Sequence, residues 1–395
     1  MPKSAYFLLL KKTIEIDTII DILIINVFLM DISPATWLLL RLVAVPGLGP
    51  VKIQQLLEFS DIGAIGSADA AELRKMGLTD SQVLSFLNGC SALERAVFWL
   101  ERSPQHHILG RQDPDYPVLL NKIASAPPVL FVKGDPALLH LPQIAVVGSR
   151  HASYVALEQT RRFACELCEA GLTVTSGLAL GIDAAAHQGA LLKGNTIAVM
   201  GTGPDSIYPA RHRRLAEQIC EQGALVSEFF PGTAPKAQHF PRRNRLISGL
   251  SIGVLISEAA RKSGSLITAK YALEQNREIF AIPGNIDNPL TEGPHLLIQQ
   301  GAKLVTNLAD ILEELAPFMP DILDKVGLDL DNSHHQRLPT GGLLDNVGYE
   351  MTTVDQVVER SLLPVNEVIR QLIELEISGE VAAVSGGYVR LRRNP

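Results

Sequence analysis

Short runs of apolar residues recur through the middle of the chain, and amphipathic stretches with helical spacing separate them. The runs cover residues 144–147, 173–176, 196–200, 224–227, 253–257 and 278–282. Apolar runs without polar alternation are typical of strands that are buried on both faces of a sheet. Their alternation with helices indicates βαβ units, so the pattern predicts an α/β fold with a Rossmann-like, mostly parallel sheet.

The chain before the sheet has helical spacing from residue 34 to about residue 100. Its first two helices meet at residues 45–50, Val-Pro-Gly-Leu-Gly-Pro, where Gly47 and Gly49 permit a tight turn. Such a turn leaves backbone amides free at the next helix start, as in helix-hairpin-helix modules that contact a DNA phosphate. A plain turn in a small helical domain explains the same residues equally well, and residues 76–79 are a weaker second copy.

The end of the chain has the pattern of a winged helix. Residues 352–359 and 364–375 have helical spacing, and residues 380–391 predict two short strands that meet at a Gly-Gly turn. The charged residues of the second helix suit a DNA groove poorly, because Glu367, Glu374 and Glu376 outnumber the single Arg370. A dimerisation or docking role for this module is therefore at least as well supported as DNA reading.

These patterns divide the chain into segments that run in the following order: an N-terminal extension (1–32), a helical, helix-hairpin-helix or SAM-like domain (33–105), a Rossmann-like core (106–316), a linker (317–342) and a winged-helix domain (343–395). Charged residues interrupt the apolar start of the extension, so it fits neither a membrane helix nor a signal peptide. Met30 looks like a natural start, so Met1 and Met30 are both candidates for the first residue. N-terminal sequencing of the native protein distinguishes them.

Composition and charge restrict the function of this chain. The 395 residues are 47% hydrophobic and 19% charged, which is typical of folded domains. The net charge of −7 repels phosphate, so nucleic-acid binding needs a local basic patch. Four cysteines without disulfide spacing predict a cytoplasmic protein with no membrane partner. The Cys165–Cys168 pair fits two buried small side chains better than a metal or redox site.

The loops after the predicted strands carry the candidate binding residues, because helix N-termini with unpaired amides meet at this edge of a parallel sheet. Arginine forks and small hydroxyl residues suit phosphate oxygens, and an aromatic face suits a base. The segment Phe-Pro-Arg-Arg-Asn-Arg, read as one of these loops, is the strongest single feature. The candidates for DNA binding are Gly148, Ser149, Arg150, Ser176, Gly177, Gly181, Phe240, Arg242, Arg243, Asn244, Arg245, Ser263 and Gly264.

The same loops offer little for catalysis. Ser176, Asp183 and His187 suggest a hydrolase, but the last two lie four residues apart on one predicted helix, and no GxSxG elbow accompanies them. A hydrogen-bonded His187 and an Asp183 in the first helical turn explain them better. The chain also lacks a phosphate-binding GxxxxGK[ST] loop and a dinucleotide GxGxxG fingerprint. We therefore expect no catalytic residue, metal or cofactor, and a protein that is not an enzyme.

The ordered motifs of residues 144–311 resemble the DNA-processing protein A (DprA, also called Smf) family. They read VVGSR, TSGLALGIDAAAH, GTGPDSIYP, SEFFPG, FPRRNRLISGLS, SEAARKSGSLITA and FAIPGN. The resemblance implies a core that binds single-stranded DNA, passes it to the RecA recombinase during natural transformation, and forms a homodimer. It also implies that residues 148–150, Ser176, Gly177, Gly181 and residues 243–245 line the DNA pocket. Leu180 departs from this pattern, because the resemblance implies a basic residue at this loop position in some relatives.

Two other functions fit parts of the sequence. A nucleotide or nucleoside-phosphate hydrolase on a related Rossmann-like core is the main alternative, but such enzymes typically carry PGGxGTxxE. This chain has Pro-Gly-Asn at residues 283–285 and lacks the glutamate. The other alternative is a structural adaptor in which the winged helix recruits partners and the core only dimerises.

Overall fold

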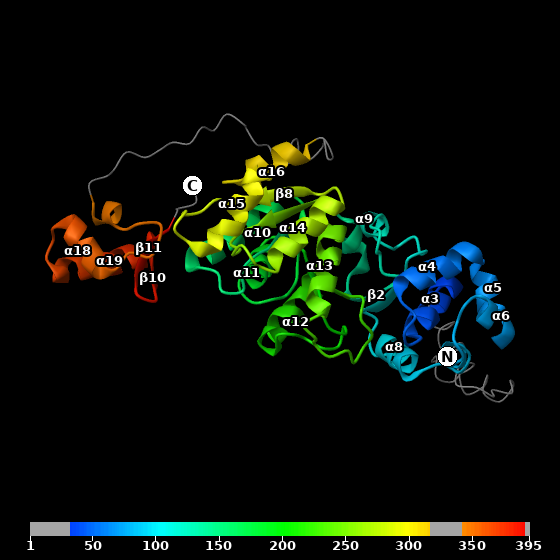
Figure 1. Ribbon diagram of the computed structural model, residues 1–395. Helices are drawn as coiled ribbons and strands as arrows, with labels where there is room; N and C mark the ends of the chain where they lie inside the picture. The colour runs from blue at the N-terminus through cyan, green and yellow to red at the C-terminus, as the bar shows by residue number, and fades with distance from the viewer. Residues whose placement is uncertain (1–31, 317–341, 392–395) are drawn as a thin grey trace.

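The computed structural model describes residues 32–316 and 342–391. The predicted extension, except for its last residue, lies outside the described residues, as does the choice between Met1 and Met30 as the start. The predicted linker, except for Gly342, lies outside them too. The remaining chain forms a helical domain, an α/β core and a winged helix (Figure 1).

The core is a nine-stranded sheet in the order β1-β2-β6-β5-β4-β3-β7-β8-β9. Neighbouring strands from β6 to β9 are parallel, whereas β1 with β2 and β2 with β6 are antiparallel. The strands are β1 (His106–Gly110), β2 (Val129–Gly134), β3 (Gln143–Val147), β4 (Thr173–Ser176), β5 (Thr196–Val199), β6 (Ala224–Ser227), β7 (Gly253–Ile256), β8 (Glu278–Ala281) and β9 (Lys303–Leu304). This confirms the predicted mostly parallel α/β fold; β1 and β9 were not predicted.

Helices cover both faces of the sheet. Along β3, Ile144 and Val146 pack on one face and Ala145 and Val147 on the other, which explains the unbroken apolar run in the sequence. One face carries α10 (Tyr154–Glu169), α11 (Ile182–Ala190), α12 (Arg213–Gln222) and α16 (Leu308–Leu315). The other carries α9 (Val118–Asn121), α13 (His239–Leu250) and α14 (Ser265–Glu274), while α15 (Glu292–Gln299) follows β8.

The helical domain packs on the antiparallel edge of the sheet. Its apolar core continues into the core domain through Phe131 of β2 and Ile108 of β1. Ser33 caps the first helix by accepting a bond from the Thr36 amide, which satisfies one of the free amides at the helix start. The helices are α3 (Pro34–Ala44), α4 (Pro50–Phe59), α5 (Ile62–Ser67), α6 (Ala70–Lys75), α7 (Asp80–Asn88) and α8 (Ser91–Glu101).

The predicted winged helix is confirmed by α18 (Val354–Ser361), α19 (Val365–Ile377) and the hairpin of β10 (Val381–Val384) with β11 (Gly387–Arg390). On α19, Arg370 is bonded to Glu367 and Glu374, so its charge is neutralised on its own helix. The exposed face of α19 also carries apolar side chains with helical spacing: Val365, Ile369, Ile373 and Ile377. The exposed face of α19 is therefore largely apolar and carries no unpaired arginine among the described residues.

Candidate nucleic-acid interface

A cleft of about 910 Å³ opens at the carboxyl ends of β3 and β7. These two strands are neighbours at the centre of the sheet, and the chain continues from β3 toward β4 on one side and from β7 toward β8 on the other. Ligands of open α/β sheets bind at such a switch point. Of the predicted site residues, the cleft is lined by Gly148, Ser149, Arg150, Phe240, Arg243, Asn244, Ser263 and Gly264.

Buried polar contacts hold the turn after β3 in place. The Ser149 amide donates to the Glu258 carbonyl at 2.5 Å, and the Ser149 carbonyl accepts from the Ile182 amide at 3.1 Å. The buried Glu258 carboxylate accepts from the amide and hydroxyl of Ser153 at 2.7 and 2.8 Å. Because the backbone of this turn is fixed, the exposed Arg150 side chain is presented at the mouth of the cleft, with its guanidinium carbon 5.7 Å from the centre of the Phe240 ring.

The Phe-Pro-Arg-Arg-Asn-Arg segment is helical, so its prediction as a loop was wrong. It forms the first half of α13, whose buried Leu246, Ile247 and Leu250 follow at helical spacing. The helical period extends backward from these apolar residues through the arginines. A helix divides the segment between two faces, so Arg243 lies on a different side of α13 from Arg242 and Arg245.

Arg243 is the buried member of the segment, with 3% of its surface exposed. Its Nη1 donates to the Gly177 carbonyl at 2.5 Å and also to the Val199 carbonyl. Burial lowers the pKa of Arg243 to about 10, against an opposing effect of the nearby Asp183. Burial likewise raises the pKa of Asp183, and the charge of Arg243 opposes that shift. Arg243 therefore ties β4 and β5 to α13 at the base of the cleft.

The glycines of the second loop serve packing within the protein. A Cβ on Gly177 would lie 2.5 Å from Arg243 Nη1. Gly181 has a φ of +72°, and a Cβ there would collide with the Ser149 carbonyl. Ser176 is buried, and its hydroxyl donates to the Val146 carbonyl at 2.6 Å. These three predicted residues lie behind the cleft wall rather than on its surface, so they shape the site without lining it.

Arg242 and Arg245 lie on the other side of α13, outside the cleft. Both donate to Glu228 Oε2 at 2.8 Å. The Glu228 and Arg245 side chains are only 2% and 7% exposed, whereas that of Arg242 is 49% exposed. The structure thus does not bring these two arginines together with the other predicted site residues.

Two lysines and a tyrosine line the cleft although they were not among the predicted site residues. Lys236 and Lys262 are exposed, and Tyr208 packs against Phe240 with 5.5 Å between ring centres. Together with Arg150, the lysines give the cleft three exposed cations, while Asp183, the one carboxylate among the lining residues that the structure describes, is buried. Their signal in the sequence was position: each follows a predicted strand, Tyr208 in the GTGPDSIYP motif and Lys262 in SEAARKSGS.

The residues of the hydrolase alternative do not form a nucleophile and base. His187 Nδ1 lies 2.7 Å from the Thr196 hydroxyl, which itself donates to the Val174 carbonyl. Nδ1 therefore carries the hydrogen, and burial lowers the pKa of His187 to about 3, so the ring is neutral. Asp183 lies in the first turn of α11 and accepts from the Ala179 amide. This confirms the predicted structural roles of His187 and Asp183.

The cysteine pair is also built into the helix packing. Cys168 is buried and Cys165 partly so, both on α10. Burial raises the pKa of the Cys168 thiol to about 12, which disfavours the thiolate that metals and disulfide exchange require. Within residues 32–316 and 342–391, no group of three or more His, Cys, Asp or Glu side chains is placed to hold a metal ion. No helix in those ranges is long and apolar enough to cross a bilayer.

Three family models match the chain in the same order as its domains. Residues 34–93 match the SMF/DprA SAM domain, residues 107–316 the DNA recombination-mediator protein A family, and residues 338–387 the DprA winged helix domain. The domains and their order are thus those of a DNA recombination-mediator class of protein. The chain belongs to the DprA/Smf family, as its motifs predicted.

Individual relatives agree with this assignment. The chain is 50% identical over 331 residues to protein Smf of Escherichia coli (strain K12), which covers 82% of this chain and 88% of the relative. The X-ray structure of DprA from Streptococcus pneumoniae superposes with a TM-score of 0.58 at 38% identity, covering 72% of this chain and 99% of that one. A Helicobacter pylori DprA structure, described for its single-stranded DNA binding mode, superposes with a TM-score of 0.50 at 29% identity. The match covers 54% of this chain and 97% of that one.

Proposed function

We propose that this protein binds single-stranded DNA in the cleft at the ends of β3 and β7, without chemical turnover and without a cofactor. The observation that carries the proposal is the pairing of three exposed cations with two adjacent aromatic rings on one concave surface. Cations neutralise backbone phosphates, and aromatic faces stack on bases of any sequence. The single-stranded DNA binding mode described for the Helicobacter pylori relative supports the same ligand.

The cleft also has features that favour a strand over a duplex. Phe240 is half-buried, and the Arg150 guanidinium lies over it, so an unstacked base has an aromatic surface next to a phosphate contact. The bases of a duplex are already stacked on each other and cannot use this surface. We therefore expect binding to be selective for single strands and tolerant of sequence.

Salt dependence tests the cleft directly. Arg150→Ala and Lys262→Ala each remove one exposed cation, so each variant is expected to bind an oligothymidylate more weakly and to lose about 0.7 from the slope of log K against log salt. Equilibrium binding of a fluorescent oligonucleotide across a salt series measures both, with duplex DNA as competitor. Lys270→Ala is the matched control, because Lys270 lies on α14 outside the cleft and its side chain is 75% exposed.

The outcome separates the competing functions. Unchanged affinity and slope in both cleft variants would remove the cleft from strand binding and leave the adaptor alternative. Absence of binding by the wild-type protein even at low salt would contradict strand binding and favour the hydrolase alternative, which an assay of nucleotide turnover tests. Loss of affinity in Lys270→Ala equal to that in the cleft variants would indicate a diffuse charge effect instead of a site.

We also propose that the protein delivers the bound strand to the RecA recombinase during DNA uptake by natural transformation and recombination. It does so as a homodimer that assembles through the core. The match to a recombination-mediator family supports the delivery role. Analytical ultracentrifugation is expected to give twice the 42.8 kDa chain mass for the protein alone and a faster species with RecA. A monomer at micromolar concentration would contradict the dimer, and unchanged sedimentation with RecA would contradict the handover.

A further inference from the structure

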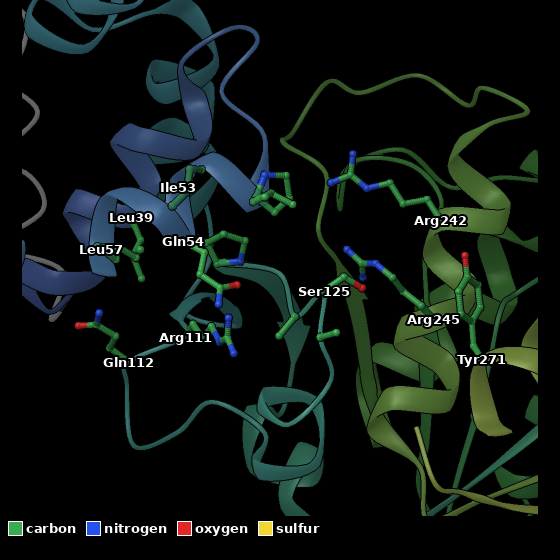
Figure 2. Close-up of a pocket in the computed structure, with 15 residues that line it drawn as sticks. Leu39, Ile53, Gln54, Leu57, Arg111, Gln112, Ser125, Arg242, Arg245 and Tyr271 are labelled. Atoms are coloured by element: carbon green, nitrogen blue, oxygen red, sulfur yellow. The ribbon is translucent and has the colours of Figure 1, made fainter. Parts of the chain in front are cut away.

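A second pocket, separate from the cleft, lies between the helical domain and the core (Figure 2). Its volume of about 490 Å³ is typical of small-molecule sites, which concentrate at domain interfaces. Helices α3 and α4 contribute one wall. The chain segments on either side of α9, with α13 and α14, contribute the other.

Polar contacts fix the two walls relative to each other. The Ser33 and Thr36 hydroxyls at the start of α3 donate to the Asp113 carboxylate at 2.7 and 2.5 Å. The same carboxylate accepts from the Gly110 amide at the end of β1 at 2.7 Å. Because the apolar core also continues from the helical domain into β2, the pocket is a defined feature of the fold and not a gap between independent domains.

Positive charge dominates one side of this pocket. Arg111, Arg242 and Arg245 line it, and no carboxylate is among the lining residues that the structure describes. Figure 2 shows Arg242 and Arg245 reaching from α13 toward the helical domain. Glu228, which bonds to these two, offsets only part of the charge.

Arg245 supplies an unused donor at this site. Its side chain is only 7% exposed, and its Nη1 has no hydrogen-bond partner within the described parts of the chain. Nη1 has almost no solvent-accessible surface, so an acceptor in the pocket reaches it only when the Arg245 side chain shifts. Pairing Nη1 with an acceptor would remove the free-energy cost of a buried donor without a partner. The geometry calls for an anion that can reach between Arg245 and the exposed Arg242.

Helix α4 adds a second source of positive potential. It begins at Pro50, and its N-cap, Gly49, provides no side-chain capping bond. Pro50 and Val51 line the pocket, so the positive end of the helix dipole borders the same space. The turn with Gly47 in a positive-φ conformation at +75° precedes this helix start, as the sequence pattern predicted.

Apart from the polar Gln54, Gln112 and Ser125, the remaining lining residues present mostly apolar surface that suits a flat ring. They consist of Leu39, Ile53, Leu57, Ala124, Ala126, Pro128 and the ring of Tyr271. We propose that this pocket binds a nucleotide, with its phosphate at the arginines and its base against the apolar wall. The ligand is either a free nucleotide or the terminal nucleotide of a DNA strand. This site is distinct from the cleft, because Arg242 and Arg245 occupy the side of α13 that faces away from it.

The test measures binding of thymidine 5′-monophosphate to the full chain by isothermal titration calorimetry. Val51 lies in the first turn of α4 and is 72% exposed, so Val51→Glu and Val51→Gln are both compatible with folding. The added carboxylate is expected to weaken thymidine monophosphate binding about tenfold relative to the isosteric glutamine. Thymidine, which lacks the phosphate, is expected to bind far more weakly than the monophosphate.

A second arm identifies the source of the nucleotide. In the Arg150→Ala/Lys262→Ala variant, whose cleft is weakened, thymidine monophosphate is expected to bind as in the wild type. Displacement by a 5′-phosphorylated oligothymidylate then assigns the pocket to a strand end, and absence of displacement assigns it to a free nucleotide. Equal monophosphate affinity in Val51→Glu and Val51→Gln, or no monophosphate binding, overturns the pocket proposal and leaves the cleft proposal standing.

Discussion

Arg243→Ala is expected to destabilise the core by about 3–5 kcal/mol, the size of effect found when one member of a buried charged network is removed. The variant leaves the Gly177 and Val199 carbonyls without their donor. It also leaves the Asp183 carboxylate, which is buried, without its main compensating charge. A urea titration followed by circular dichroism measures the change as a lower unfolding midpoint.

The pH dependence of this effect has a definite sign. Burial raises the pKa of Asp183 in the folded protein, so the ionised carboxylate costs stability as pH rises above the unfolded value of about 3.9. Without Arg243 the folded pKa rises further, because the charge that opposed the shift is gone. The stability difference between wild type and Arg243→Ala is therefore expected to be smaller near pH 4.5 than at pH 7.5.

Arg150→Ala is the matched control for this prediction. Arg150 is exposed at the cleft mouth, so its removal should weaken strand binding without changing the urea midpoint. Arg243→Ala should lower both the strand affinity and the urea midpoint, because Arg243 anchors the cleft wall and its removal destabilises that wall. Normal stability in Arg243→Ala together with lost DNA binding would contradict the positioning role and make Arg243 a direct phosphate contact.

Much of the fold could be predicted because its strands are buried on both faces. Runs such as 144–147 and 253–257 carry no polar alternation, and only a central parallel sheet hides them completely. The edge strands lacked this signal. β1 begins with His106 and His107, which are half-buried, and β9 is two residues long. β1 pairs only with β2 and β9 only with β8, so hydrogen bonding to a single neighbouring strand, and not local pattern, makes these segments strands.

The candidate site was predictable as a location but not as a set of contacts. Parallel strands bring their carboxyl ends to one edge, and Gly148–Arg150 and the Ser263 loop accordingly line the same cleft. The division of the arginine cluster depends on Glu228, which lies on the preceding strand end and whose burial no local pattern reveals. A short cluster of arginines therefore indicates positive charge, whereas only the helix phase shows which arginine reaches the ligand.

The Glu228 carboxylate holds the non-cleft side of α13, and its removal gives the second large expected effect. Glu228→Gln leaves Arg245 buried with no carboxylate bonded to it, so a destabilisation of about 3–5 kcal/mol is expected in the urea titration. A Glu228→Met/Arg245→Met variant removes both charges, and its stability is expected to return close to that of the wild type, because a buried ion pair and a well-packed apolar pair are often similar in free energy.

The two sides of α13 also predict that Glu228→Gln affects only one of the two ligands. Strand affinity per folded molecule should not change, because Glu228 does not line the cleft. Thymidine monophosphate affinity should increase, because Arg242 and Arg245 keep their charges while the carboxylate that offsets them is lost. Titrations without urea, at a temperature well below the unfolding transition, measure both affinities. A parallel loss of the two affinities would show that α13 responds as one unit and that its two sides are not separate binding surfaces.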